Sequence, residues 1–295
     1  MIFRGARSAG FGTATAGGYD ARSLAAPPRP DAGRARMSIN LKSKGEIERM
    51  RAAGRVVRQV LNRCEAFIRP GVTTGQIDAE CHRVFTDAGA KGLFKNYPTY
   101  KAGEGFPGNV CISVNDCVVH GIGDDTVIED GDIVGIDCGV QYEGWCGDAA
   151  TTVLVGNVDP RTRKLCEITQ HVLRLAVENI RPGRRWSQIA RLMQGYAESH
   201  GLGVVRDFVG HGIGKSMHED PKVPNFVNRD LLRNDIVLRE GLVLAIEPMC
   251  TLGKPETYTL ADGWTVLTVD GEPSAHYEHT IAVTASGTDV LTDGR

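Results

Sequence analysis

Hydrophobic and polar residues follow two patterns along this chain, one typical of helices and one typical of strands. Apolar residues recur at helical spacing over residues 43–67, behind a Ser-Lys-Gly-Glu sequence that fits a capping box. We therefore expect a helix there and a second helix over residues 73–85, before a loop at 90–109. The pattern returns later in the chain and predicts helices over 162–179 and 186–200.

Alternation with a period of two predicts the strands. In the first part of the chain these are 110–114, 117–119, 132–140 and 147–155, the last two joined by a tight turn. Later strands are expected over 204–209, 242–249 and 275–284, the last two forming a hairpin with a long insertion. Two helices followed by a sheet, repeated twice, predict an α+β fold with helices covering one face of a curved antiparallel sheet.

The chain also repeats its own sequence. Residues 68–71 recur as 180–183, residues 120–123 (His-Gly-Ile-Gly) recur as 211–214, and residues 131–137 recur as 241–247. We therefore expect two related halves, about 43–156 and 162–291, within a single domain over 38–295. Folded about a pseudo-two-fold axis, the acids and histidines of both halves would meet at one central site.

Composition narrows the class of protein. The formal net charge is −2 and 41% of the residues are hydrophobic, which gives no indication of bulk attraction to nucleic acid or membranes. No apolar run approaches the roughly 18 residues of a membrane helix. The eight cysteines lack metal or redox spacing, so we expect reduced thiols, mostly in the core of a cytoplasmic protein.

Residues 1–37 differ from the rest of the chain, and we expect a disordered extension there. Its first 36 residues are rich in Arg, Gly and Ala and lack Lys and Glu, so they cannot build a core. One interpretation is a transit peptide, which would target an organelle. The other is translated sequence upstream of a start at Met37. We favour the second, because three prolines at 27–30 would spoil an amphipathic targeting helix.

Five side chains stand out as candidates for chemistry. Asp137 and Asp148 lie on the two strands of the first predicted hairpin, where their carboxylates can share ions. The candidates in the second half are His211, Glu247 and Glu278. Several acids inside apolar strands are costly unless they bind cations.

Two divalent metal ions would resolve this repulsion. Carboxylates can bridge two ions, and one imidazole without thiolates suits Mn, Fe, Co or Zn. A pair of ions about 3.5–4 Å apart lowers the pKa of a bound water toward roughly 7 and provides hydroxide for attack on a carbonyl. The sequence therefore predicts a dinuclear hydrolytic site.

The motifs around these residues resemble those of type I methionine aminopeptidases. The motif residues are 114–122, 210–214, 217–221, 246–249 and 277–280, and the likeness runs from about Ile39 to the C-terminus. The resemblance implies the pita-bread fold and removal of the initiator methionine from chains with a small second residue. It implies a nascent-chain or peptide N-terminus as substrate and a monomeric enzyme. The ribosome is a further candidate partner, whereas nucleic acid and membrane are not required.

The resemblance also implies a role for each site residue. Asp137 would chelate one metal ion, Asp148 and Glu278 would bridge both, and His211 and Glu247 would complete the other. Glu247 would also move the proton. His120 and His218 would contact the peptide group and the tetrahedral intermediate without binding metal.

The methionine pocket implied by the resemblance is lined by Phe106, Cys111 and Trp264. One position departs from the family, because relatives often have a tyrosine in the pocket-edge loop where this chain has Gly103. Either Tyr97 or Tyr100 takes its place, or one rim of the pocket is open.

Two other classes compete with this hypothesis. An Xaa-Pro aminopeptidase or prolidase would share the fold, but such enzymes usually carry an extra N-terminal domain. The second alternative is a binding protein on the same fold that has lost its metals. In such proteins the metal-ligating residues are replaced, whereas all five are present here. A peptide panel and the metal content of the purified protein separate the three.

Overall fold

The computed structural model describes residues 39–98 and 105–295, all of which fall within one compact unit. The predicted extension over 1–37 lies outside the described residues, as do Tyr100 and Gly103 at the predicted pocket edge. Among the described residues, no helix is long and apolar enough to cross a membrane. All eight cysteines are buried free thiols, as the sequence predicts.

The first half of the chain begins with the two expected helices. Helix α1 spans Lys44–Phe67 and α2 spans Thr74–Asp87. Both start at capping boxes, in which the residue before the helix and its third residue satisfy each other's free backbone donors. The strands that follow are β1 (Lys91–Gly92), β2 (Cys111–Val114), β3 (Cys117–Val119), β4 (Ile133–Tyr142) and β5 (Trp145–Leu154).

The second half repeats the helices and then divides into shorter strands. Its helices are α3 (Pro160–Asn179), α4 (Trp186–Ser199) and the short α5 (Arg229–Arg233). Its strands are β6 (Gly203–Val204), β7 (Gly210–Gly212), β8 (Glu219–Val223), β9 (Val243–Ile246), β10 (Met249–Thr251), β11 (Thr257–Thr259), β12 (Val266–Thr268), β13 (Ser274–His276), β14 (His279–Val283) and β15 (Thr288–Val290).

The repeated sequence has a repeated backbone. The residues that end α1 and α3, Ile68 and Ile180, have φ/ψ of −68°/122° and −68°/125°. The N-cap residues of α2 and α4 each form an isolated bridge, Thr73 with Val127 and Arg185 with Val237. The helices α2 and α4 have the same length of 14 residues. The internal repeat is therefore structural as well as sequential.

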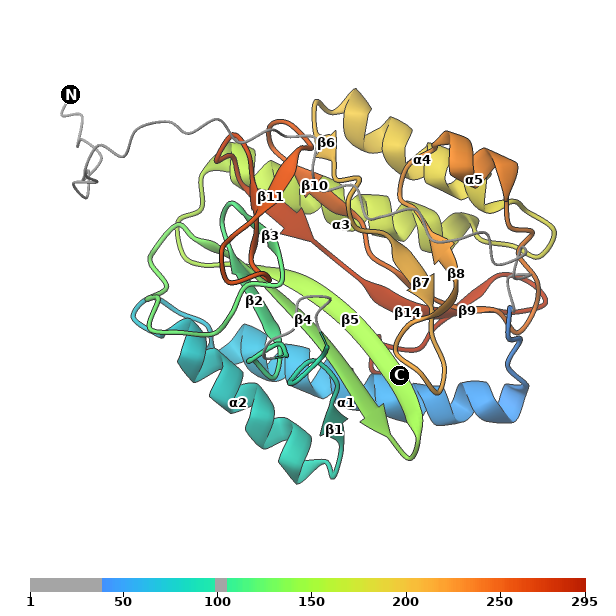
Figure 1. Cartoon of the computed structure of the whole chain (residues 1–295), viewed down its shortest axis with the longest axis horizontal. Coiled ribbons are helices and arrows are strands. Elements are labelled where there is room, and N and C mark those ends of the chain that lie inside the picture. Colours follow the sequence, from blue (N-terminus) through green and yellow to red (C-terminus); the bar gives the residue numbers. More distant parts are fainter. Residues whose placement is uncertain (1–38, 99–104) are drawn as a thin grey trace. The chain divides into compact units, whose positions relative to one another are not determined.

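All described strand pairs are antiparallel, as expected for this α+β arrangement. In the first half β4 pairs with β5 along its whole length, with β2 near its start and with β1 near its end. In the second half the strand order of the largest sheet is β15-β14-β9-β7-β8. Figure 1 shows α1 and α2 below the strands in that view, and α3 and α4 above them.

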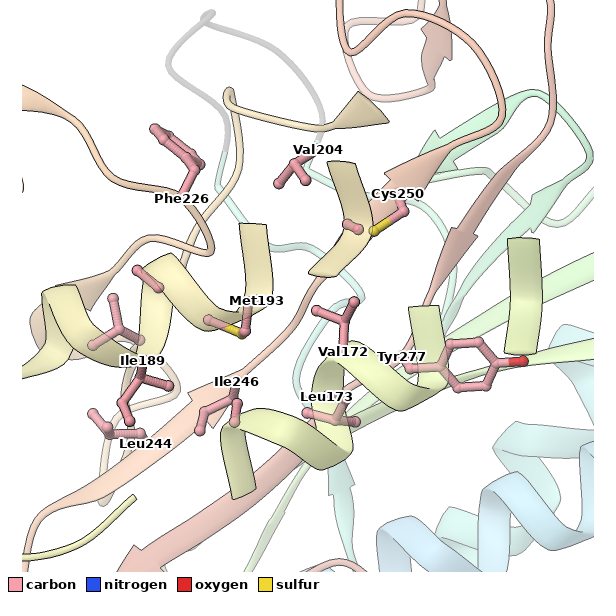
Figure 2. Close-up of a cluster of buried hydrophobic side chains, with 14 of the residues drawn as sticks. Val172, Leu173, Ile189, Met193, Val204, Phe226, Leu244, Ile246, Cys250 and Tyr277 are labelled. Atoms are coloured by element: carbon pink, nitrogen blue, oxygen red, sulfur yellow. The ribbon is translucent and has the colours of Figure 1, made fainter. Parts of the chain in front are cut away.

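Apolar side chains between helices and strands form one large core cluster in each half. The cluster of the second half holds Val172 and Ile189 from α3 and α4, against Leu244 and Ile246 of β9 (Figure 2). Because side chains alternate along a strand, a β9 that buries Leu244 and Ile246 against the helices turns Ala245 to the opposite face. The helices therefore fix which side of the sheet is left for polar residues.

Three predicted strands are wrong in extent. Of the expected strand 204–209, only Val204 lies in a strand, β6, and the chain re-enters a sheet at β7. The expected hairpin of 242–249 and 275–284 is broken in both strands, into β9 and β10 and into β13 and β14. Pro248 has no N–H to donate, so the ladder is interrupted beside it.

Candidate metal centre

The first half presents its two acids on one uninterrupted hairpin. On β4, Ile136 and Cys138 are buried in the core, so Asp137 points to the other face. Asp148 on β5 lies directly opposite Gly139, two residues from Asp137, so the carboxylates are diagonal neighbours on one face. A Cβ at Gly139 would approach Asp148 Oδ1 to 3.3 Å and the Met217 Sδ to 3.1 Å, so glycine keeps this face open.

The second half presents one candidate on an interior strand and two at breaks between strands. His211 on β7 pairs with Ala245 of β9, two residues before Glu247. Glu247 follows the last residue of β9, and Glu278 lies in the gap between β13 and β14. The side-chain amide of Asn225 donates to the Glu247 carbonyl at 3.0 Å and supports the backbone at this break.

A seam of hydrogen bonds joins β5 of the first half to residues 276–280 of the second. The Thr280 hydroxyl donates to the Asp148 carbonyl at 2.7 Å and accepts from the Asp148 N–H at 3.0 Å. The N–H of Glu278 donates to the Ala150 carbonyl at 2.9 Å. These bonds hold an acid of each half, Asp148 and Glu278, next to each other.

Three side chains already have the spacing of a metal site. One ligand atom from each of Asp148, His211 and Glu278 lies within 4.8 Å of the others, and all three residues are buried. His211 Nε2 is 3.7 Å from Glu247 Oε1 and 4.0 Å from Asp148 Oδ2. Asp137 lines the same cavity. The structure therefore brings together all five residues that the sequence singled out.

Burial and mutual repulsion disturb the acidity of this cluster. Burial raises the pKa of Asp148 to about 7, and burial together with the Asp148 charge raises the pKa of Glu247 to about 8. The pKa values of Asp137 and Glu278 lie well above their usual range, first through burial and then through the neighbouring carboxylates. In the absence of cations such a cluster resists full ionisation.

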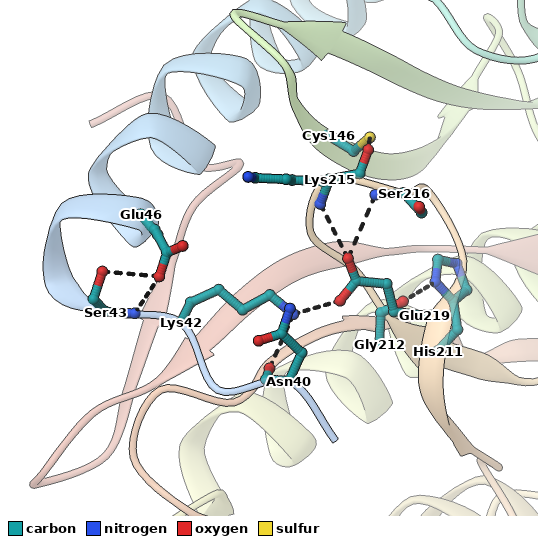
Figure 3. A network of polar contacts seen from close by, with 10 residues as sticks. All are labelled: Asn40, Lys42, Ser43, Glu46, Cys146, His211, Gly212, Lys215, Ser216 and Glu219. Atoms are coloured by element: carbon teal, nitrogen blue, oxygen red, sulfur yellow. Dashed lines mark hydrogen bonds and ion pairs between the residues drawn. The ribbon is translucent and has the colours of Figure 1, made fainter. Parts of the chain in front are cut away.

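His211 has the tautomer that a metal ligand needs. Its Nδ1 lies 2.9 Å from the Gly212 carbonyl oxygen, which can only accept, so Nδ1 carries the proton (Figure 3). Burial lowers the pKa of His211 to about 4, so the ring is neutral at pH 7. The Nε2 lone pair is thus free to face Asp148 and Glu247, an arrangement typical of histidine ligands.

The residues present fit divalent cations. Asp137 Oδ1, Asp148 Oδ1 and Glu278 Oε1 are buried and have no hydrogen-bond partner among the described residues. Buried carboxylate oxygens without partners are costly, and cations would satisfy them. Carboxylates with one neutral imidazole and no thiolate form a donor set for borderline or hard divalent metals.

The cluster lies in a cavity of about 720 Å³ that also holds the predicted substrate residues. Phe106, Cys111 and Trp264 line it, and the Phe106 and Trp264 rings meet edge to face at 5.3 Å. Phe94 and Met217 complete this apolar wall. Phe94 was not singled out from the sequence, because it lies in an irregular segment with no periodicity to indicate its direction.

The two predicted catalytic histidines line the same cavity. His120 follows β3 with φ of 58°, and its ring meets Phe208 edge to face at 5.2 Å. The His218 ring lies 4.2 Å from that of His211, and the Tyr97 hydroxyl is 2.8 Å from His218 Nδ1. Neither histidine belongs to the three-residue metal group.

A buried ion pair fixes the backbone beside His218. Lys42 Nζ donates to Glu219 Oε2 at 2.6 Å, and Glu219 Oε1 accepts from the N–H of Lys215 at 3.0 Å (Figure 3). The Lys42 side chain is only 2% exposed. The segment before α1 therefore holds the turn that carries His218. The two partners are 177 residues apart, so no local pattern could reveal this contact.

A second hollow of about 500 Å³ lies between the end of α1 and α2, away from the cluster. Its carboxylate, Glu80, is paired with Arg63 and Arg83. Because the carboxylate of this hollow is already neutralised by arginines, the candidate metal ligands are those of the larger cavity.

Comparisons with known proteins agree with this geometry. The model of metallopeptidase family M24 matches residues 48–285. A methionine aminopeptidase of Clostridium perfringens is 44% identical over 254 residues, which are 86% of this chain and 98% of that protein. The crystal structure of a methionine aminopeptidase from Thermotoga maritima superposes with a TM-score of 0.81 at 40% identity, covering 86% of this chain and 99% of the other.

More distant structures share the fold alone. A prolidase from Pyrococcus furiosus superposes with a TM-score of 0.68 at 23% identity, covering 86% of this chain and 66% of that protein. The predicted α+β pita-bread fold is therefore confirmed. The chain belongs to metallopeptidase family M24, and within that family it groups with the methionine aminopeptidases.

Proposed function

We propose that this chain is a metallo-aminopeptidase that removes the N-terminal methionine from proteins and peptides whose second residue is small. The observation that carries the proposal is the grouping of Asp148, His211 and Glu278 in one cavity with an apolar wall. The names of its high-coverage relatives support the same activity.

The residues that would hold metal are Asp137, Asp148, His211, Glu247 and Glu278. We propose two divalent ions per chain, drawn from Mn, Fe, Co and Zn, with Asp148 and Glu278 shared between them. The seam through Thr280 supports this sharing, because it places one acid of each half side by side. When bound, such ions supply Lewis-acid polarisation of the scissile carbonyl and an activated water.

The protein's own groups would position the substrate and move the proton. Glu247 takes up on its carboxylate the proton that the attacking water loses and delivers it to the leaving amine, acting first as a general base and then as a general acid. His218 donates a hydrogen bond to the carbonyl oxygen as negative charge develops there. His120 contacts the peptide group from the Phe208 side of the cavity.

The apolar wall would select the side chain of the first residue. Phe106, Cys111 and Trp264 offer an unbranched thioether both packing area and aromatic edges. Phe94 and Met217 close the same wall beside Gly139. Burying methionine here would hold its amide bond over the metal cluster and exclude water.

The test is release of methionine by metal-stripped protein. The protein is incubated with a Met-Ala-Ser peptide and Mn, Co, Fe or Zn separately, and free methionine is followed by mass spectrometry. We expect metal-dependent release from Met-Ala-Ser and little from Leu-Ala-Ser or from an Ala-Pro peptide. Cleavage of the Ala-Pro peptide alone would instead show an Xaa-Pro specificity. A folded protein inactive on every peptide would contradict the proposal.

The cellular location, oligomeric state and partner of the enzyme are part of the proposed function. We propose that the enzyme acts in the cytoplasm as a monomer on emerging or finished N-termini, with the ribosome as a candidate partner. Ultracentrifugation checks the oligomeric state, and co-sedimentation with ribosomes in the presence and absence of high salt checks the partner. A stable dimer would contradict the first part, and absence from the ribosomal pellet at low salt would contradict the second.

A further inference from the structure

The ring of His218 is contacted by a side chain from a distant and irregular segment. The Tyr97 hydroxyl oxygen lies 2.8 Å from His218 Nδ1, and the two rings meet edge to face at 5.6 Å with an interplanar angle of 69°. The residues are 121 positions apart, and both line the cavity. We infer that Tyr97 is a positioning residue that sets both the orientation and the tautomer of His218. The inference rests on the proposed role of His218 in the reaction.

The backbone of Tyr97 is held firmly enough for this task. Its N–H donates to the Phe94 carbonyl at 2.8 Å, and its carbonyl accepts from the Phe106 N–H at 3.0 Å. The preceding Asn96 N–H donates to the Phe106 carbonyl at 2.7 Å. Residues 96–97 are thus paired with Phe106, whose ring packs on Trp264 in the cavity wall.

The close approach of these two stretches depends on a glycine. A Cβ at Gly105 would come within 2.6 Å of the backbone of Asn96. Asn96 itself has φ of 64°, in the left-handed region that asparagine tolerates better than most residues. This local geometry turns Tyr97 toward the cavity and links its position to that of Phe106.

The hydrogen bond at Nδ1 decides what Nε2 can do. A neutral imidazole carries one proton, and the partner of one ring nitrogen fixes which nitrogen holds it. A tyrosine hydroxyl that donates to Nδ1 leaves the proton on Nε2. Nε2–H is then available as a donor for a carbonyl oxygen on which negative charge develops. The opposite tautomer would present a lone pair to that oxygen and repel it.

Two contacts with different functions therefore converge on His218. The Lys42–Glu219 pair fixes the backbone of the neighbouring residue, whereas Tyr97 contacts the ring itself. His211, on the other side of the ring, is committed through its own Nδ1 to the Gly212 carbonyl. Tyr97 is thus placed to orient the one ring while leaving the metal-ligating histidine untouched.

The direct test is the tautomer of His218 in the metal-free protein. We would record the imidazole ¹⁵N spectrum of the whole chain for the parent and for Tyr97→Phe, with a His218→Asn variant to assign the signals. The parent should show protonated Nε2 and unprotonated Nδ1, and Tyr97→Phe should show a mixture of both tautomers. Identical His218 signals in the two proteins would overturn the inference.

Kinetics with the metal-loaded protein give the second readout. Tyr97→Phe removes one hydroxyl and keeps the ring, so we expect kcat to fall about 5–10-fold with KM little changed, as for loss of one hydrogen bond. Tyr258→Phe, which alters an exposed tyrosine outside the cavity, is the matched control. A Tyr97→Phe variant with full kcat would also overturn the inference.

The two readouts separate the inference from the proposed function. The ¹⁵N measurement needs neither metal nor substrate, so it decides the tautomer even if the parent protein releases no methionine. Circular dichroism and the thermal midpoint establish that each variant is folded. A parent that cleaves no peptide but loses its single tautomer in Tyr97→Phe would reject the proposed function and retain the contact.

Discussion

The two halves of this protein each begin with two equivalent helices but position their acids differently. The first half carries Asp137 and Asp148 on one unbroken hairpin, β4 and β5, whose register alone makes the carboxylates neighbours. The second half carries Glu247 and Glu278 where the equivalent hairpin is interrupted. The internal repeat thus preserves the helices and sheets of each half. The breaks in the strands of the second half place its acids beside those of the first.

The repeated His-Gly-Ile-Gly sequence shows the same contrast. His211 is part of β7, where pairing with Ala245 directs it toward the acids. His120 follows β3 with a left-handed φ of 58° and lies against Phe208. The histidine of the same tetrapeptide therefore belongs to the candidate metal group in one half and lines the cavity wall in the other, because the backbone around it differs.

The largest expected effect comes from removing Asp148, the acid of the first half that we propose both metal ions share. Asp148→Asn keeps the shape of the side chain but removes the charge that cations require. We expect loss of bound metal, and a fall in activity of more than about 100-fold, since partners one step further from a metal already cost 10–100-fold. Metal content is measured by mass spectrometry after dialysis. Asp125→Asn, at an exposed aspartate, is the control.

Glu278→Gln repeats the experiment on the second half. If both halves are needed for one site, each variant should lose metal to a similar degree. An Asp148→Asn protein that retained the full metal content would contradict the sharing of the site between halves.

A smaller effect, on stability, is expected from breaking the ion pair by which Lys42 of the first half contacts Glu219 of the second. Lys42→Met leaves the Glu219 carboxylate without its cation in a nearly closed environment. We expect a loss of about 3 kcal/mol in the free energy of unfolding, at the lower end for a broken buried ion pair. Lys44→Met, at an exposed position, should change it little. Chemical denaturation followed by fluorescence measures both.

A double variant sharpens this result. Lys42→Met with Glu219→Gln removes both charges while the amide oxygen can still accept from Lys215 and Ser216. The double variant should be more stable than Lys42→Met alone. If the two substitutions were simply additive, the pair would not be the reason for the loss.

The smallest effect is a pH dependence in the metal-free protein. Burial raises the pKa of Asp148 to about 7 and of Glu247 to about 8, whereas unfolded carboxyl groups titrate near roughly 4. Between roughly pH 7 and 8 the folded chain thus holds protons that the unfolded chain has lost, so stability falls as pH rises. His120 and His211, with pKa near 4, act with the opposite sign mainly below this window.

The slope is at most about 1.4 kcal/mol per pH unit for each such proton. Urea denaturation of metal-stripped protein at a series of pH values measures it. Glu247→Gln should make the slope shallower, and saturating metal should abolish it, because bound cations replace the protons. A metal-free stability that rose across this window would show that these carboxyls are already ionised in the fold.

Much of the scaffold was predictable from the sequence. Helical periodicity, with a capping box before the first helix, predicted the four long helices to within a few residues, whereas the short α5 was not predicted. The alternation of β4 and β5 placed Asp137 and Asp148 on neighbouring strands, because one buried face forces the register. The break at Glu247 escaped detection, since the apolar pattern continues through Pro248 into β10.

Contacts between distant segments were beyond such patterns. Lys42 and Glu219 look like ordinary solvent-exposed charges in the sequence, and only the tertiary fold buries them together. Tyr97 was one of two candidates for a rim position, but its partner His218 could not be named because the loop that carries it has no regular secondary structure. Local sequence determines which face of a helix or strand a side chain occupies. These contacts depend instead on how distant helices, strands and loops pack together.

The most direct test of a site shared by the two halves is a crystal structure of the Mn-loaded protein with anomalous diffraction data. The account predicts anomalous density within bonding distance of Asp148 from the first half and of Glu278 and His211 from the second. Density bound only by residues of one half, or absent from this cavity while metal is present at full content, would contradict it.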